Sequence, residues 1–284
     1  MQNPIGIYEK ALPRNMSWVE RFQAARKSGY DFLELSVDET PERMARLDWS
    51  LAERLEFFRS SRESGVPVPS MCLSGHRKFP FGSADPDIRA KAADFMEKAI
   101  VFASDTGIRV IQLAGYDVYY EPTTRESSER YCEGMERALL LAARHQVMLA
   151  LETMDTTFLN SISKYLVLKE RLASPWFTVY PDLGNLSAWG NDIARELALG
   201  IDHIVGIHIK ETKPVSPDFP GGFRDIPFGA GSVDFVHCFK TLHDLDYAGP
   251  FLVEMWTEKA ADPIKEIAQA RLWVGERLKQ GGYA

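Results

Sequence analysis

The sequence predicts an α/β fold, a single (β/α)8 TIM barrel over residues 1–284. Eight short apolar runs alternate with eight longer segments of helical period, which is typical of βα units around a parallel sheet. Successive runs are spaced as in an eight-unit barrel of about 250 residues, and no Ser/Gly-rich linker interrupts them. The longest irregular segments, 74–83, 116–124 and 212–231, each follow a predicted strand, where such barrels carry their active-site loops.

The apolar runs are rich in β-branched and other apolar residues and are expected to form the strands of the barrel. These predicted strands cover residues 5–9, 32–37, 69–74, 110–115, 148–153, 177–182, 204–210 and 251–256.

Between the strands, apolar residues recur at helical spacing. Leu51, Leu55 and Phe58, for example, predict the inward face of the second helix, and Gly65 directly after it predicts where that helix ends. The predicted helices cover residues 17–28, 50–64, 84–106, 125–145, 161–172, 191–199, 233–245 and 263–279.

Composition and charge exclude several classes of function. The net charge of −7 and the isoelectric point near 5.5 provide no basic surface for nucleic acid or for an anionic membrane. The first ten residues lack the pattern of a secretory signal and no apolar run is long enough to span a bilayer, so we expect a cytoplasmic protein. Cys72, Cys132 and Cys238 are odd in number and lack paired metal-ligand spacing, which argues against disulfides and a thiolate zinc site.

Four consecutive predicted strands end on a residue that can bind a metal ion: Glu152, Asp182, His208 and Glu254. One such residue alone is commonly a solvated rim group, but the carboxyl ends of barrel strands converge on one mouth. Burying three carboxylates together without a cation would be strongly unfavourable. The sequence therefore predicts a divalent metal site, with Mn²⁺ favoured and Mg²⁺, Co²⁺ or Zn²⁺ as alternatives, and with positions left for two substrate oxygens.

Seven segments, in order along the chain, resemble the bacterial L-ribulose-5-phosphate (L-xylulose-5-phosphate) 3-epimerases: IGIYEKALP, SGHRKFPFGS, IQLAGYDVYYE, NSISKY, VYPDLGNLSAWGND, FRDIPFGAGSVDF and VEMWTE. That family belongs with the xylose-isomerase-like TIM barrels and is similar to the D-tagatose 3-epimerases. The resemblance aligns their Glu, Asp, His, Glu metal set with Glu152, Asp182, His208 and Glu254. It also places Asn185 where the free-sugar epimerases carry a second, substrate-binding histidine, so their substrate contacts do not transfer as a whole.

The resemblance implies an enzyme that inverts C3 of a pentulose 5-phosphate in L-ascorbate and related pentose catabolism, and a homo-oligomer, a dimer or higher. The C3 proton lies next to the C2 carbonyl and becomes removable once a metal stabilises the enediolate. We expect Glu152 and Glu254 on opposite faces of C3, one removing the proton and the other delivering a proton, with roles exchanged in the reverse direction. Asp182 and His208 are then chiefly metal ligands.

Phosphate recognition requires backbone donors and cationic side chains. The sequence offers Ser74, Gly75, His76 and Arg77 after the third strand, with Lys210 and Arg224 later; Arg77 and Arg224 as solvated surface charges are the alternative. Two further residues are candidate substrate contacts. Asn185 follows Asp182 closely, and Glu9 ends the first strand, where it would hold a substrate hydroxyl or pair with Lys10.

Three other functions compete with epimerisation. An aldose–ketose isomerase would use the same metal set with the sugar displaced by one carbon. A metal-dependent endonuclease acting at abasic DNA should carry more histidine ligands and a basic face, which this chain lacks. A non-catalytic sugar-binding barrel would not need two acid–base carboxylates.

Overall fold

Eight parallel strands form one sheet in the order β6-β5-β4-β3-β2-β1-β8-β7 in a computed structural model, which describes residues 3–283. Two isolated parallel bridges, between Val179 and Ile204 and between Asp182 and His208, join the two outer strands and close the sheet into a barrel. The α/β fold and the TIM barrel are thus confirmed. The strands are β1 (Ile5–Tyr8), β2 (Phe32–Ser36), β3 (Ser70–Cys72), β4 (Val110–Ala114), β5 (Met148–Glu152), β6 (Phe177–Tyr180), β7 (Ile207–Ile209) and β8 (Phe251–Val253).

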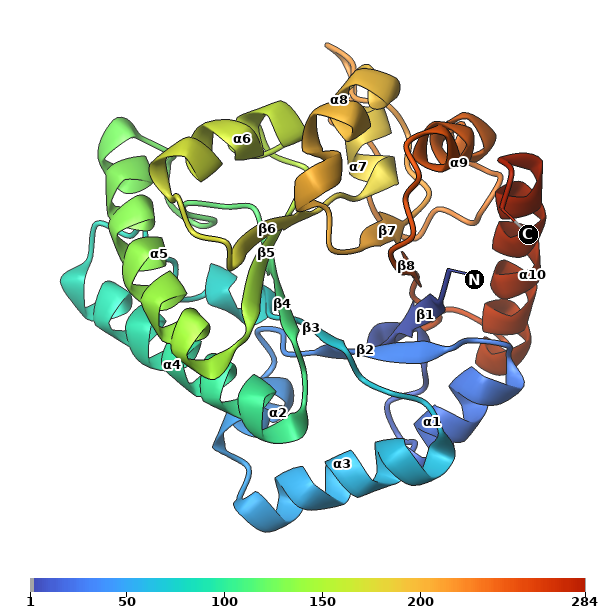
Figure 1. The fold of residues 1–284 in the computed structure, drawn as a ribbon, viewed down its shortest axis with the longest axis horizontal. Helices are drawn as coiled ribbons and strands as arrows, with labels where there is room; N and C mark the ends of the chain where they lie inside the picture. The colour runs from blue at the N-terminus through green and yellow to red at the C-terminus, as the bar shows by residue number, and fades with distance from the viewer. Residues whose placement is uncertain (1–2, 284) are drawn as a thin grey trace.

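Helices surround the barrel, as the view in Figure 1 shows. The eight predicted helices are present as α1 (Trp18–Lys27), α3 (Leu51–Ser64), α4 (Pro86–Thr106), α5 (Arg125–His145), α6 (Ile162–Arg171), α8 (Ile193–Gly200), α9 (Phe235–Asp244) and α10 (Pro263–Gln280). The sequence did not predict the short helices α2 (Pro41–Met44) and α7 (Leu183–Ala188), nor the 3-10 turns η1 (Glu9–Ala11), η2 (Ala45–Asp48), η3 (Ser74–Arg77) and η4 (Ile201–His203).

Local signals explain where the helices begin and end. Ser17 and Ser50 each form a capping box with the glutamate three residues later, which satisfies free backbone N–H groups at the starts of α1 and α3. Gly65 ends α3 at a φ of 71°, a left-handed conformation that glycine adopts without strain.

All eight predicted strands exist, but every predicted range extends one to three residues beyond the carboxyl end of the observed strand. Glu254 follows the last residue of β8, and Ser74 already begins the turn η3. These residues stand where the chain leaves the sheet at the carboxyl end of the strands. Their polar side chains therefore project at the mouth of the barrel instead of into its packed apolar layers.

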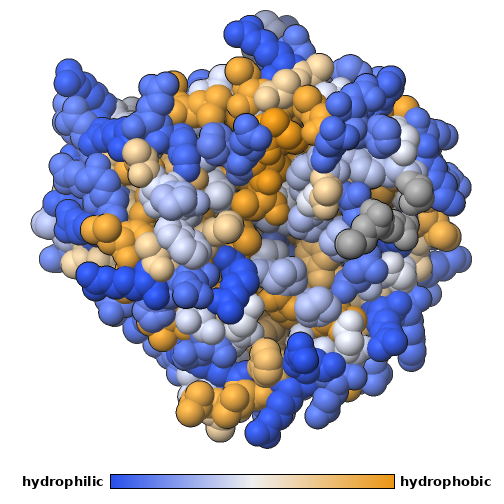
Figure 2. Space-filling model, in the orientation of Figure 1, coloured by the Kyte–Doolittle hydropathy of each residue, from blue (hydrophilic) through white to orange (hydrophobic). Residues whose placement is uncertain are grey.

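The predicted inward face of α3 is wrong. Leu51, Leu55 and Phe58 are exposed, and Phe57 is the buried aromatic of this helix. The ring of Trp18 lies edge-on to Phe57 at 4.7 Å between centroids, so contacts with α1 determine which face of α3 turns inward. Hydrophobic residues gather at the lower edge of Figure 2, where α3 lies in Figure 1.

Among residues 3–283, no helix combines the length and the apolar character needed to cross a membrane.

Candidate active site

The structure brings Glu152, Asp182, His208 and Glu254 together at one end of the barrel. Glu152 is the last residue of β5, Asp182 caps α7, His208 lies in β7 and Glu254 follows β8. All four are buried, and one ligand atom from each lies within 4.8 Å of the others. His208 Nδ1 is 3.0 Å from Glu152 Oε1 and 3.6 Å from Glu254 Oε2, so the imidazole faces both proposed acid–base carboxylates.

The donor set fits a divalent cation. Asp182 Oδ2 and Glu254 Oε2 are buried and accept no hydrogen bond from any described residue. Lys210 Nζ approaches them at 2.8 Å and 3.1 Å, but without hydrogen-bond geometry. Burial raises the pKa of Asp182 to about 7 although the Lys210 ammonium opposes the shift. Three buried carboxylates beside a single ammonium leave an excess of negative charge, which a cation stabilises.

Two polar side chains that the sequence analysis did not single out support this cluster from inside the barrel. Glu34 of β2 lies with its Oε1 3.3 Å from His208 Nε2. Gln112 of β4 donates a hydrogen bond from its side-chain amide to Glu152 Oε2. Both residues are fully buried in otherwise apolar strands. That interruption of an apolar strand is the signal that also singled out the four ligand candidates.

Lys210 and Asn185 lie beside the cluster. Lys210, a predicted phosphate contact, lines the mouth pocket, but its ammonium lies between Asp182 and Glu254 and is already paired with both carboxylates. Asn185 lies on α7, a helix that the sequence did not predict, and its side-chain amide nitrogen donates to the Thr153 carbonyl at 2.7 Å. Its buried Oδ1 accepts no hydrogen bond from the described residues, and the side chain lines the pocket, so it offers an acceptor to a ligand there.

A pocket of about 670 Å³ opens at the mouth of the barrel above Glu152 and Glu254. Its cationic lining residues are Lys10, Arg14, Arg77, Lys210 and Arg224.

Only part of the predicted phosphate segment reaches this pocket. Ser74 and Arg77 line it, whereas Gly75 and His76 do not. The Gly75 N–H donates to the Val37 carbonyl at 2.9 Å, and the His76 N–H donates to the Leu73 carbonyl at 3.3 Å. Burial also lowers the pKa of His76 to about 4, so its side chain is neutral near pH 7. The backbone N–H groups of both residues are therefore already used, and His76 supplies no positive charge for a phosphate.

The cations of the pocket differ in their partners. Arg224 pairs with Glu258 at 3.3 Å and lies over the ring of Trp256 at 4.7 Å. Lys10 and Arg14 also have acidic partners. Arg77 lies over the rings of Tyr116 and Tyr119 at 5.7 Å and 5.1 Å, and no carboxylate of residues 3–283 is within ion-pair distance of it.

Both expectations for Glu9 are wrong. Its carboxylate is fully buried and binds the guanidinium groups of Arg21 and Arg46, with Arg46 at 2.6 Å and 2.8 Å, and it accepts the Ser36 N–H at 2.8 Å. These donors leave no oxygen for a substrate hydroxyl, and Glu9 does not line the pocket. The ammonium of Lys10 pairs with Asp38 instead, at 2.7 Å.

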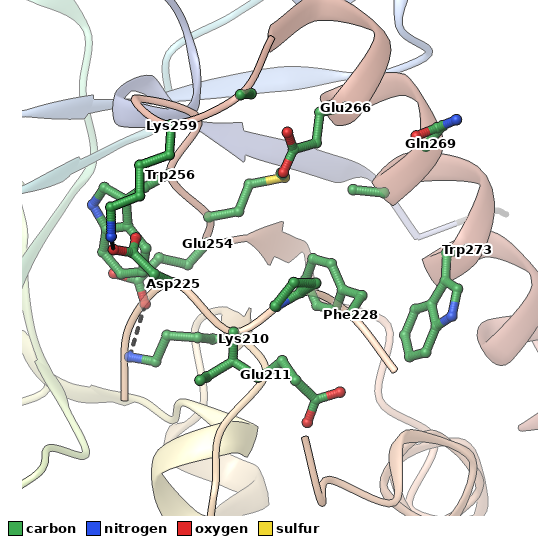
Figure 3. Close-up of a pocket in the computed structure, with 15 residues that line it drawn as sticks. Lys210, Glu211, Asp225, Phe228, Glu254, Trp256, Lys259, Glu266, Gln269 and Trp273 are labelled. Carbon is green, nitrogen blue, oxygen red and sulfur yellow. Dashed lines mark hydrogen bonds and ion pairs between the residues drawn. The ribbon is translucent and has the colours of Figure 1, made fainter. Parts of the chain in front are cut away.

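A second, smaller pocket of about 350 Å³ lies beside the first, against α10 (Figure 3). Phe228 and Trp273 form part of its wall and stack at 5.3 Å between ring centroids. Lys210, Glu254 and Trp256 line both pockets. Lys210 and Glu254 therefore lie between the two hollows, and Figure 3 shows the ion pair that joins them.

Comparisons with known proteins agree with this architecture. The family described as "Xylose isomerase-like TIM barrel" matches residues 22–277. SgbU of Escherichia coli (strain K12) is 58% identical over 98% of this chain and 98% of its own length. UlaE of Escherichia coli (strain SMS-3-5 / SECEC), named an L-ribulose-5-phosphate 3-epimerase, is 53% identical over 99% of this chain and 97% of its own.

A solved structure of an L-ribulose 3-epimerase superposes with a TM-score of 0.81 over 98% of this chain and 95% of that one. At 18% identity, that likeness supports the fold alone. The family match and the relatives that align along the whole chain show the family: this chain belongs to the L-ribulose-5-phosphate 3-epimerase family, within the xylose isomerase-like TIM barrels.

Proposed function

We propose that the protein is a divalent-metal-dependent epimerase that interconverts L-ribulose 5-phosphate and L-xylulose 5-phosphate by inversion at C3. The observation that carries this proposal is the convergence of three buried carboxylates and one imidazole within 4.8 Å at the mouth of the barrel. The name of the UlaE relative supports the choice of substrate. Both acid–base carboxylates line the mouth pocket, where a small sugar phosphate would bind.

In this proposal Glu152, Asp182, His208 and Glu254 hold the ion, which when bound polarises the C2 carbonyl and so acidifies the C3 proton. Glu152 and Glu254 transfer the proton. Glu152 comes from β5 and Glu254 from the end of β8, and two strands, β6 and β7, lie between them around the barrel. The two carboxylates therefore approach a bound sugar from different sides. One carboxylate removes the C3 proton and the other delivers a proton to the opposite face, and the reverse reaction exchanges the roles.

The reaction is tested with the Mn²⁺-loaded protein and L-ribulose 5-phosphate in deuterated buffer. We expect L-xylulose 5-phosphate carrying deuterium at C3, loss of turnover after chelation, and recovery when Mn²⁺ is restored. An aldopentose phosphate labelled at C2, with deuterium at C1 of the recovered ketose, would identify an aldose–ketose isomerase instead. Unchanged turnover of chelated protein shown to be metal-free would contradict the metal requirement.

The substrate phosphate is assigned to Arg77, with Ser74 on the same turn. Arg77 is the lining cation for which the described residues provide no acidic partner, and its buried Nε has no hydrogen-bond acceptor among them. Two aromatic rings hold the guanidinium in place. An unpaired guanidinium at the mouth binds a phosphate without first having to break an ion pair.

Replacing Arg77 by Met is expected to raise KM for L-ribulose 5-phosphate by roughly 10- to 100-fold, the value of one or two charge-assisted hydrogen bonds. KM for unphosphorylated L-ribulose should change little, and steady-state kinetics on both sugars measures the contrast. Arg224→Met is the matched control, with a smaller effect expected because Glu258 already pairs with Arg224. A larger effect of Arg224→Met would move the phosphate to that side of the pocket.

The proposal has five further parts. The chain acts as a single domain, its ion is Mn²⁺, it assembles as a homo-oligomer, it resides in the cytoplasm, and it serves L-ascorbate catabolism. Metal analysis of the purified protein and light scattering after gel filtration test the ion and the assembly.

A further inference from the structure

Glu34 is a buried carboxylate that the epimerisation mechanism does not use. It lies inside the barrel on β2 with 0% of its surface exposed, so its charge has no contact with bulk water. Its Oε1 is 3.3 Å from His208 Nε2, on the far side of the ring from the ligand cluster. Ser70, its neighbour in the β2–β3 ladder, donates a hydrogen bond to Glu34 Oε2 at 2.6 Å.

The two nitrogens of His208 thus face two different partners. Nδ1 points to Glu152 and Glu254, while Nε2 points to Glu34. A neutral imidazole carries one proton, and only the nitrogen without it can bind a metal ion. A carboxylate acceptor at Nε2 keeps the proton there and leaves the lone pair of Nδ1 directed at the cluster.

Other contacts fix the ring in this orientation. The Tyr180 ring packs against the His208 ring at 4.7 Å between centroids and an interplanar angle of 63°. Ser70 holds the Glu34 carboxylate from the next strand. Side chains from β2, β3 and β6 therefore determine how a residue of β7 presents its nitrogen to the cluster.

We propose that Glu34 is a positioning residue that holds His208 in the tautomer and orientation needed to bind the metal ion. This inference rests on the metal site of the proposed function. Glu34 also adds a fourth buried carboxylate to Glu152, Asp182 and Glu254, and so increases the negative charge that a bound cation would offset.

The test measures the Mn²⁺ dissociation constant by chelator competition, and the Tm of metal-free protein, for the full-length wild type, Glu34→Leu and Glu34→Gln. Glu34→Leu is expected to weaken Mn²⁺ binding by about 10- to 100-fold, as with other outer partners of metal ligands. Glu34→Gln, whose amide oxygen still accepts the Nε2 proton, should restore most of the affinity.

Asp117→Asn is the matched control. Asp117 is equally buried and accepts hydrogen bonds from Thr123 and Ser127, outside the ligand cluster. The Asp117→Asn substitution should lower Tm without changing Mn²⁺ affinity. Wild-type affinity in Glu34→Leu, with only a lower Tm, would overturn the positioning role.

If Glu34→Leu does not fold, Mn²⁺ binding is measured with Ser70→Ala instead. Loss of the hydroxyl that holds Glu34 should weaken Mn²⁺ binding by less than Glu34→Leu would, and unchanged affinity would overturn the inference. A wild-type protein that binds no Mn²⁺ would overturn the proposed metal site as well, which separates the two failures.

Discussion

Glu152→Gln is expected to lower kcat on L-ribulose 5-phosphate by about 10²- to 10⁴-fold, the range for loss of a general acid–base group. Gln cannot take up the C3 proton at neutral pH, but it retains the shape of Glu152 and can still accept the hydrogen bond from Gln112. Steady-state kinetics at saturating Mn²⁺, with the metal content measured, separates lost chemistry from lost metal. Glu254→Gln should show a loss of the same order.

Isotope exchange provides a second test of the roles of Glu152 and Glu254. With Glu152 replaced, Glu254 should still exchange the C3 proton of one epimer with deuterated buffer, while inversion is lost. Glu254→Gln should show the same behaviour with the other epimer. Glu196→Gln is the control, since Glu196 is buried on α8, accepts the Ser163 N–H, and belongs neither to the ligand cluster nor to the lining of the mouth pocket. Full turnover in Glu152→Gln would remove Glu152 from the mechanism.

The barrel and the ligand cluster were predictable because both follow from local patterns. An apolar run of strand length that ends on an acidic or imidazole side chain recurs at β5, β6, β7 and β8. In a barrel, strands consecutive in sequence are neighbours around the ring, so their carboxyl ends meet. No long-range information was needed to bring Glu152, Asp182, His208 and Glu254 to one place.

The position of Lys210 could have been predicted from the same pattern. Side chains two residues apart on a strand point to the same face, so Lys210 should follow His208 toward the barrel interior. The structure places it there, against Asp182 and Glu254. Treating it only as a free cation for phosphate overlooked this alternation.

The environment of Glu9 could not be predicted in this way. Its partners Arg21 and Arg46 stand 12 and 37 residues further along the chain, and they reach it through α1 and the turn η2, one of which the sequence did not predict. The inward face of α3 likewise depends on an aromatic contact with α1. Both depend on contacts between elements, which strand and helix periodicity do not encode.

Glu9→Gln is expected to destabilise the protein by about 3–5 kcal/mol, the range for breaking a buried ion pair by removing one partner. Glu9 is 0% exposed, and Arg21, Arg43 and Arg46 around it are 4–5% exposed, so three guanidinium groups would lose their shared counter-charge away from water. Thermal unfolding should show a Tm lower by roughly 10 °C. Glu129→Gln, which breaks the exposed pair with Arg125, should change Tm little.

The pH dependence of the stability difference between wild type and Glu9→Gln tests whether that difference is electrostatic. Burial alone would raise the pKa of Glu9, but the Arg46 guanidinium and its neighbours lower it below the ordinary value. A carboxyl whose pKa is lower in the folded than in the unfolded state stabilises the fold above its unfolded pKa, and this contribution disappears as the pH falls through the folded pKa. The gap in stability between wild type and Glu9→Gln should therefore be widest near neutral pH and narrow in acid. A gap that stayed constant with pH would mean that packing, and not the charge of Glu9, stabilises this part of the barrel.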